Sequence, residues 1–461
     1  MADLDSEPLD FTPYISAPRS SDIFAIFYTS VIEPSLISAF EDVDVDLFFT
    51  LTVLHVPTVE REILVSPLVV IFTTTDENVE TIRAAVESVW TQNRFQRYLV
   101  CVSIGQPNES SRLEMPPLFD GYPTRTYHEH WKCGVSIGYG SKTATSGAIV
   151  VDDADEFAAV TCAHLFNERR QDARGLQVSQ PSYEDFRHLY SASLAYRNHC
   201  RKVRDTTTNT ASKAEWGTRY TAANDLVNQL DEVGHDTLEH YQSDTPIGTV
   251  LKSSYEVIEF RGRRCLRDYA ILRLDGRYPD NGDVFYDPLP TKGYLAEIQW
   301  SAEADSVGNL QYDVQVKKRG AATGVTYGIV AGVHGVVKSA GEGAVRKEFW
   351  VLPEALSPSY EFADKGDSGA LVGTKDGEAV GVVIAGWTAA FEGVRAVILP
   401  NLFWDTKNIP FPRDEEGRID FKGLLSFAVT RPLVLIESFE MILEDIAESN
   451  YQLYVPSFID L

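Results

Sequence analysis

The sequence predicts a mainly β protein with a helical insertion and a C-terminal helix, preceded by a small α/β domain. From residue 134 onward, short apolar runs bounded by glycines recur, which is typical of barrels and sandwiches. A charged stretch at 168–243 with helix-spaced apolar residues interrupts these runs. The chain has 461 residues, of which 44% are hydrophobic, so it is long enough for two domains. We divide it into residues 1–126 and 127–461.

The first 126 residues predict a strand, a helix and a second strand. The run PLVVIFT at 67–73 predicts the first strand, and RYLVCVSIG at 97–105 predicts the second. Between them, residues 76–95 carry apolar side chains at helical spacing. The proline-rich segment at 113–123 indicates that this domain ends near residue 126.

The remaining residues predict a β scaffold with helical additions. The strand-like segments include VSIGYG, SGAIVV, AAVTCAHLF, YAILRL and VTYGIVAGVHGVVKS. The insertion at 168–243 reads as two helices around the polar link DTTTNTAS. Near the end, a strand precedes an amphipathic helix, for which we expect one apolar face formed by Ile436, Phe439, Ile442 and Leu443.

Charge and cysteine content limit the partners and the compartment. The formal charge of −26, from 67 acidic and 41 basic residues, repels phosphate backbones and anionic membranes. We therefore expect no nucleic-acid partner and no membrane partner. Five scattered cysteines do not resemble a disulfide framework, and the first residues do not resemble a secretory signal. These observations predict a reducing compartment, the cytoplasm.

The tetrapeptide Gly366-Asp367-Ser368-Gly369 is the strongest chemical signal in the chain. Glycine at 366 lets the backbone turn so that the amides of Gly366 and Ser368 point at one spot, where they would form an oxyanion hole. Ser368 is the candidate nucleophile. A buried Asp367 would hold the turn by accepting hydrogen bonds or a cationic partner. A glycine-rich turn between strands is the alternative interpretation.

A serine hydroxyl needs a base that takes its proton, and the base needs a group that orients it. His164 ends the strand-like run VTCAH, and Asp268 lies at the mouth of the alternating run DYAILRL. Taken alone, His164 would be a core histidine and Asp268 a surface carboxylate. Together with Ser368 they predict a catalytic triad.

The sequence resembles the chymotrypsin/trypsin-like serine peptidases in three blocks: TCAH around His164, RDYAILRL around Asp268 and GDSGALVG around Ser368. The order His, Asp, Ser is that of chymotrypsin. A fourth block at 316–328 is similar to the strand that opens the second barrel in disulfide-free members. The resemblance covers about residues 131–448 outside the insertion and implies two six-stranded antiparallel β-barrels with the site between them. The N-terminal segment is similar to that of intracellular fungal trypsin-like proteins.

The resemblance also implies a specificity pocket. The residue six positions before the nucleophile, Phe362, would lie at its floor, and Gly386 on its wall. Because the floor is not acidic, cleavage after Arg or Lys is disfavoured, and we expect a small or apolar side chain or a closed pocket. The chain has no IVGG-like segment whose freed N-terminus would pair with Asp367, so we expect no trypsin-style zymogen cleavage.

The segment HEHWKC presents a candidate metal site. On a strand, His128 and His130 would share a face and, with Cys133, could bind a soft metal. A fourth ligand is not evident, so we expect a linker-edge strand there, no metal and no cofactor.

These residues favour a serine endopeptidase that cleaves a protein or peptide substrate through an acyl-enzyme, with narrow specificity in intracellular processing. The alternative is a latent or inactive protease-fold protein that acts as a binding or signalling module. The insertion between the His and Asp strands favours this alternative, because an insertion there would gate the cleft. The sequence leaves the oligomeric state open.

Overall fold

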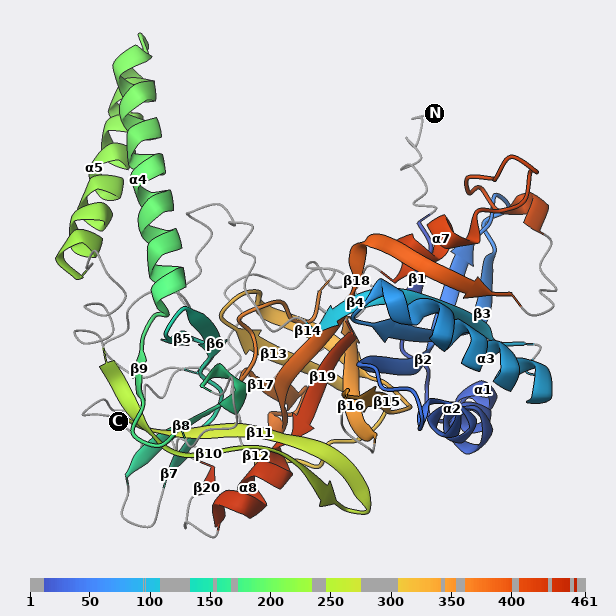
Figure 1. Ribbon diagram of the computed structural model, residues 1–461. Coiled ribbons are helices and arrows are strands. Elements are labelled where there is room, and N and C mark those ends of the chain that lie inside the picture. The colour runs from blue at the N-terminus through green and yellow to red at the C-terminus, as the bar shows by residue number, and fades with distance from the viewer. Residues whose placement is uncertain are drawn as a thin grey trace.

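The computed structural model describes residues 12–93, 95, 97–107, 133–151, 156–166, 173–233, 246–274, 306–340, 345–353, 361–399, 406–429, 433–447 and 452–453. The strands of these residues form two sheets, one of twelve strands and one of eight (Figure 1). The predicted mainly β class is therefore confirmed.

Six strands of the larger sheet close into a barrel. In the order β13, β14, β16, β19, β18 and β17, each strand pairs with the next, and β17 pairs again with β13. Buried aliphatic side chains such as Val316, Val351 and Val372 fill its interior. The strands are β13 (Gln315–Gly320), β14 (Gly324–Val330), β16 (Arg346–Pro353), β17 (Leu371–Thr374), β18 (Glu378–Ile398) and β19 (Leu433–Ser438).

The smaller sheet is a half-barrel. Its strands follow the order β20, β7, β8, β11, β10, β9, β5, β6, and within the described residues its two end strands do not pair with each other. Of the two six-stranded barrels that were expected, one is closed and the other is open. The strands are β5 (Ser136–Tyr139), β6 (Lys142–Thr145), β7 (Ile149–Val151), β8 (Phe157–Thr161), β9 (Gln177–Ser179), β10 (Pro246–Phe260), β11 (Arg263–Leu274) and β20 (Gln452–Leu453).

The N-terminal strands extend the sheet of the closed barrel. β2 (Leu47–Pro57) pairs with β15 (Gly335–Lys338), which pairs with β16, and β4 (Leu99–Pro107) pairs with the far half of β18. β3 (Ile63–Thr73) and β4 are parallel and are joined through α3 (Val79–Asn93), which confirms the predicted strand, helix and strand. The predicted boundary at 126 lies outside the described residues. β1 (Tyr14–Ser16) and β12 (Ser306–Val307) complete this sheet.

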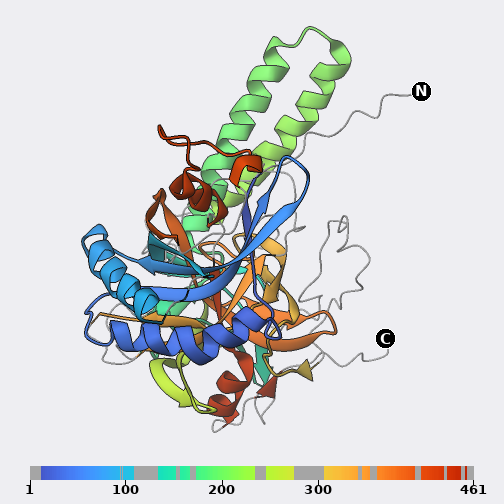
Figure 2. The same ribbon diagram turned by 90° about the vertical axis from the view of Figure 1, so that its right-hand side faces the viewer.

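Helices cover one face of the N-terminal strands (Figure 2). The helical run Ile23–Phe40 consists of α1 (Ile23–Phe27), a π-helical turn (Tyr28–Ile32) and α2 (Glu33–Phe40). By length and composition it would be long and apolar enough to cross a membrane. Its stripe of Tyr28, Ile32, Leu36 and Phe40 is fully buried in the core beneath it, so the run packs one face against the protein.

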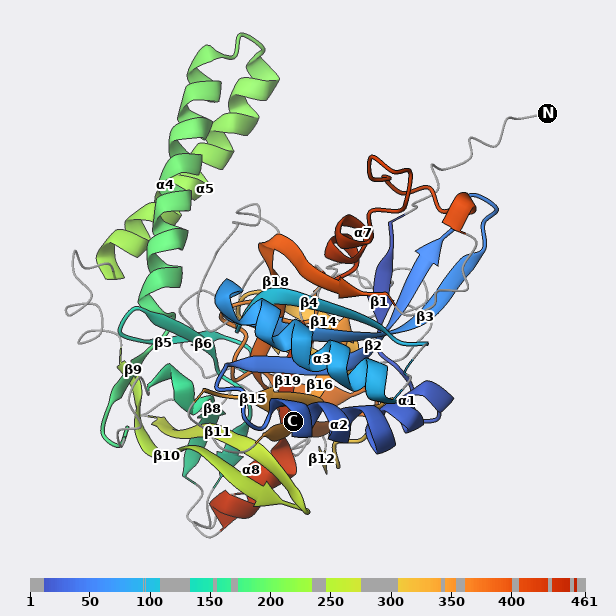
Figure 3. The ribbon, with the colours of Figure 1, turned by 45° about the vertical axis from the view of Figure 1, so that its right-hand side comes forward.

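The insertion forms a helical hairpin that stands away from both barrels (Figures 1 and 3). It consists of α4 (Tyr183–Thr206) and α5 (Thr210–Val233), so its predicted helical character is confirmed. At its base, the side chain of Ser182 caps α4 by accepting a hydrogen bond from the amide of Asp185 at 3.1 Å.

The C-terminal helix α8 (Phe439–Ala447) packs Phe439, Ile442 and Ile446 between the two sheets. Ile436, which was expected on this helix face, instead belongs to β19, because the strand continues to Ser438 before the helix begins. A shorter helix, α7 (Phe421–Ala428), contacts β18.

Candidate active site

The end of β8 places His164 beside Asp268. β8 pairs antiparallel with β11, and Thr161 lies opposite Ala270. Because the strands run in opposite directions, the turn that follows Thr161 meets the residues that precede Ala270. That turn is a short 3-10 helix, Ala163–Leu165, which carries His164.

Asp268 is a buried acceptor aimed at His164. Its Oδ2 lies 2.5 Å from Nδ1 of the imidazole, and its side chain is 1% exposed. Its Oδ1 accepts hydrogen bonds from the backbone amides of Ala163 at 2.7 Å and His164 at 2.9 Å. One carboxylate therefore fixes both the backbone and the ring of the histidine.

Burial lowers the pKa of His164, but its interactions with Asp268 and Cys162 outweigh burial, so the pKa lies well above the usual range. The imidazolium form is thus stabilised in place. A group of this kind accepts a proton readily and holds it close to Asp268.

The turn that carries Ser368 is bound to the half-barrel. The carbonyl of Ser368 accepts a hydrogen bond from the amide of Thr145 at 2.8 Å. Gly369 has a φ of +90°, and a Cβ added there would lie 2.4 Å from the carbonyl oxygen of Thr145 and 3.1 Å from the backbone nitrogen of Cys162, so no side chain fits. The serine turn therefore lies against the segment that leads into His164.

The hydroxyl of Ser368 donates to the carbonyl oxygen of Ile384 at 3.4 Å. In the described part of the chain it forms no hydrogen bond with His164. The amides on either side of it are engaged, since Asp367 donates to Asp364 and Gly369 donates to Val383. By contrast, the amides of Gly366 and Ser368 form no hydrogen bond to any described residue, as an oxyanion hole requires.

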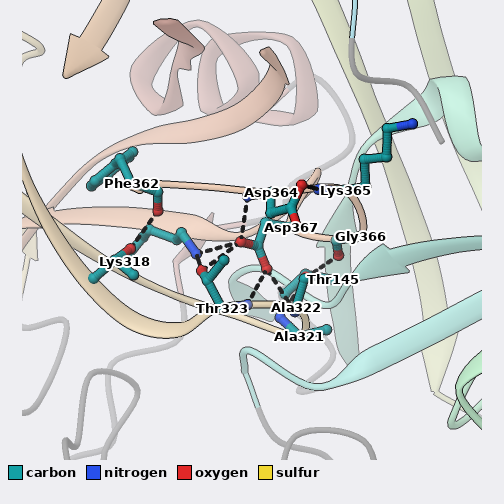
Figure 4. A network of polar contacts seen from close by, with 11 residues as sticks. Thr145, Lys318, Ala321, Ala322, Thr323, Phe362, Asp364, Lys365, Gly366 and Asp367 are labelled. Carbon is teal, nitrogen blue, oxygen red and sulfur yellow. Dashed lines mark hydrogen bonds and ion pairs between the residues drawn. The ribbon is translucent and has the colours of Figure 1, made fainter. Parts of the chain in front are cut away.

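A buried ion pair holds the aspartate of the serine turn, Asp367 (Figure 4). Nζ of Lys318 lies 2.6 Å from Oδ2 of Asp367, and both side chains are 0% exposed. Asp367 also accepts from the amide of Ala322 at 2.7 Å and from the hydroxyl of Thr323 at 2.7 Å. The carboxylate thus has both kinds of partner that the sequence suggested, a cation and hydrogen-bond donors.

Thr145 joins the turn to the opposite sheet. Its Oγ1 donates to the carbonyl of Gly366 at 2.7 Å and accepts from the amide of Ala321 at 2.9 Å. Gly366 has a φ of +97°, a conformation that favours glycine. The peptide groups of the turn are therefore constrained by both barrels.

A family model described as Peptidase family S64 matches residues 149–398, which is more than half of the chain and includes all three residues of the expected triad. The chain belongs to peptidase family S64. It is therefore a serine protease whose substrate is a peptide, and its fold is trypsin-like.

Solved structures add distant likenesses to this S64 peptidase. Thermobifida fusca Protease A has a TM-score of 0.34 at 12% identity, over 70% of this chain and 98% of that one. Nocardiopsis Protease has a TM-score of 0.34 at 11% identity, over 70% of this chain and 98% of that one. Cellulomonas bogoriensis chymotrypsin has a TM-score of 0.28 at 13% identity, over 58% and 90%. No curated protein matches the sequence.

Of the two residues expected at a specificity pocket, Gly386 lies on β18 and Phe362 lies in the closed barrel. Phe362 is fully buried in the core of the closed barrel, where Thr326 donates a hydrogen bond to its carbonyl. A cavity of about 230 Å³ lies beside His164, and neither Phe362 nor Gly386 lines it. Its lining includes Asp46 and Thr74 of the N-terminal region.

The candidate metal ligands of HEHWKC fall mostly outside the described residues. The described residues contain no group of three His, Cys, Asp or Glu side chains placed to hold a metal ion. Cys133 is a buried free thiol, whereas His128 and His130 lie outside the described residues.

Sequence reasoning missed Lys318 as the partner of Asp367. The signal in the sequence was the adjacent pair Lys317 and Lys318 in a predicted strand. Successive side chains of a strand point to opposite faces, so one of the two lysines must point inward. It also missed Glu437, which accepts a hydrogen bond from the amide of Asp268 at 2.9 Å. A single acidic residue in the apolar run LVLIES was the signal there.

Proposed function

We propose that this S64 peptidase is an endopeptidase that cleaves peptide bonds through an acyl-enzyme, with His164, Asp268 and Ser368 as its catalytic residues. The observation that carries the proposal is the Asp268 carboxylate, which accepts from the ring of His164 and from the two backbone amides beside it. That arrangement sets the imidazole tautomer and leaves the other ring nitrogen free to act as a base.

In the first half of the reaction, Oγ of Ser368 bonds to the scissile carbonyl carbon while His164 takes the hydroxyl proton. The carbonyl oxygen becomes an oxyanion, which the amides of Gly366 and Ser368 would stabilise. When the C–N bond breaks, the imidazolium gives its proton to the leaving amine. Water then attacks the acyl-enzyme with His164 again as the base, which releases the acid and restores Ser368.

The resting hydroxyl has to turn toward the histidine before this reaction begins. Its present acceptor is the carbonyl of Ile384 at 3.4 Å, a long and therefore weak hydrogen bond. This contact and the filled position at Phe362 also favour the second candidate function, a latent protease-fold protein that acts by binding.

We further propose narrow specificity and a reducing compartment such as the cytoplasm. The buried Phe362 supports narrow specificity, because it takes up space at the expected pocket floor. All five cysteines are buried free thiols, which supports the reducing compartment. Oxidising refolding that yields a native disulfide would contradict the second point.

Covalent labelling with a fluorophosphonate, followed by mass spectrometry of the modified peptide, tests the proposal. Labelling at Ser368 that is lost in both Ser368→Ala and His164→Ala would support an assembled triad. Circular dichroism of the two variants controls for folding. A folded parent protein that does not label would favour the latent or binding function.

A further inference from the structure

Two carboxyl groups of the closed barrel lie buried behind Asp268. They belong to Glu348 on β16 and Glu437 on β19, and each residue is 2% exposed. Phe349 lies opposite Ile436 in the β16–β19 ladder, so the next position in the same register places Glu348 opposite Glu437. Two acidic residues directly across a strand pair repel each other when both are ionised.

Both carboxyl groups bind the strand that carries Asp268. Oε2 of Glu437 accepts from the amide of Asp268 at 2.9 Å, and Oε1 of Glu348 accepts from the amide of Leu266 at 2.8 Å. Alternate amides of β11 point in the same direction, so the two glutamates accept hydrogen bonds along one edge of this strand. They hold the half-barrel strand to the closed barrel at the catalytic aspartate.

The charges around Glu437 disfavour its ionised form. Asp268 and Glu348 face it with negative charge, and Arg267 is the facing cation. Arg267, however, is paired with Asp445 at 2.7 Å and with Glu256. Glu348 in turn faces Arg346 and Arg263 as well as Asp268.

One oxygen of Glu437 also lacks a donor. Its Oε1 is buried and has no hydrogen-bond partner among the described residues. An ionised carboxylate is costly in such a place, because its charge is neither solvated nor paired. Burial and the Asp268 charge accordingly raise the pKa of Glu437 well above its ordinary value, and burial raises that of Glu348.

We infer that Glu437 is a neutral acid in the folded protein and that, in this form, it positions Asp268. When Glu437 ionises as the pH rises, the active site loosens. The step from Asp268 to catalysis rests on the proposed function, whereas the neutral state of Glu437 does not. A glutamine at 437 would keep an acceptor for the amide of Asp268 and would remain neutral at every pH.

Thermal unfolding from pH 5 to pH 9 tests the neutral state without any assay of activity. The unfolded chain ionises Glu437 near pH 4.3, while the folded chain does so only at higher pH. Between these two pKa values the folded state holds one more proton than the unfolded state. The parent protein therefore loses stability relative to Glu437→Gln as the pH rises through this window. We expect the melting temperature of Glu437→Gln to rise relative to that of the parent over this range.

The exposed Glu444 on α8 provides the matched control. Glu444→Gln should show a melting-temperature difference from the parent that stays flat with pH. An equally flat difference for Glu437→Gln would overturn the inference.

The rate of fluorophosphonate labelling at Ser368 tests the positioning role. In the parent, the rate should rise as His164 loses its proton and fall again as Glu437 ionises. In Glu437→Gln the fall should disappear, whereas Glu437→Ala, which leaves the amide of Asp268 without its acceptor, should label at least tenfold more slowly at all pH values. If the labelling rates of the parent and Glu437→Gln fall at the same high pH, the inference is overturned. If the parent never labels but the melting-temperature difference changes with pH as expected, only the proposed function is overturned.

Discussion

Lys318 forms a fully buried ion pair with Asp367, the residue directly before the proposed nucleophile, with 2.6 Å between Nζ and Oδ2. Burial lowers the pKa of Lys318, yet the carboxylate partner and the hydroxyl of Thr323 solvate its charge. The cation comes from within the chain, on β13. The site therefore has a cationic partner for Asp367 within the chain.

Replacing Lys318 by methionine should disable the site. The change leaves Asp367 as an unpaired buried charge, which typically costs about 3–5 kcal/mol. We expect a lower free energy of unfolding in urea and loss of labelling at Ser368. Lys317→Met is the control, because this equally buried neighbour lies on the other face of β13. Labelling of Lys318→Met at the parental rate would contradict this role.

Asp268→Asn should keep the fold but slow the reaction by about 10⁴-fold, the loss known for the same change in chymotrypsin-type triads, because the amide does not hold the required imidazole tautomer. Labelling kinetics measured with a folded variant check this. A loss smaller than tenfold would mean that Asp268 is not the orienting group.

The pH dependence of labelling should place the acid limb above pH 6.5, the ordinary value for histidine, because the pKa of His164 is raised. The reaction needs the neutral imidazole, so the rate rises with pH through that pKa. The same shift stabilises the fold fully below about pH 6.5, and this contribution is lost as the pH rises through the folded-state pKa. In Asp268→Asn the acid limb should move to lower pH.

Thr145→Val should misplace the amides that we propose for the oxyanion hole. It removes the hydrogen bond to the carbonyl of Gly366 and the one from the amide of Ala321. We expect labelling to slow by about 10- to 100-fold, as for other small misplacements of catalytic groups. Thr52→Val is the control, since its hydroxyl also donates to a backbone carbonyl, that of Leu68, but far from the site. Equal rates for both variants would contradict the role of Thr145.

Shortening the helical hairpin should leave the active site intact. Removing residues 194–222 and joining the stems by a glycine-rich turn keeps the base of α4, where Asp185 is bonded to Ser182. Because the hairpin stands away from the barrels (Figure 1), the labelling rate should not change. A faster rate would instead indicate that the hairpin gates the cleft.

The sequence by itself determined the local parts of this protein: the strand, helix and strand near the N-terminus, the helical hairpin, and the residue types at 164, 268 and 366–369. These follow from patterns read within about ten residues, such as period-2 alternation and a glycine turn. Only the tertiary structure decided which distant segments meet. Phe49 pairs with Val336, Lys318 reaches Asp367, and Glu437 caps the amide of Asp268. The physical reason is that strand pairing and buried charge pairing depend on complementarity between segments far apart in the chain, which no local pattern encodes.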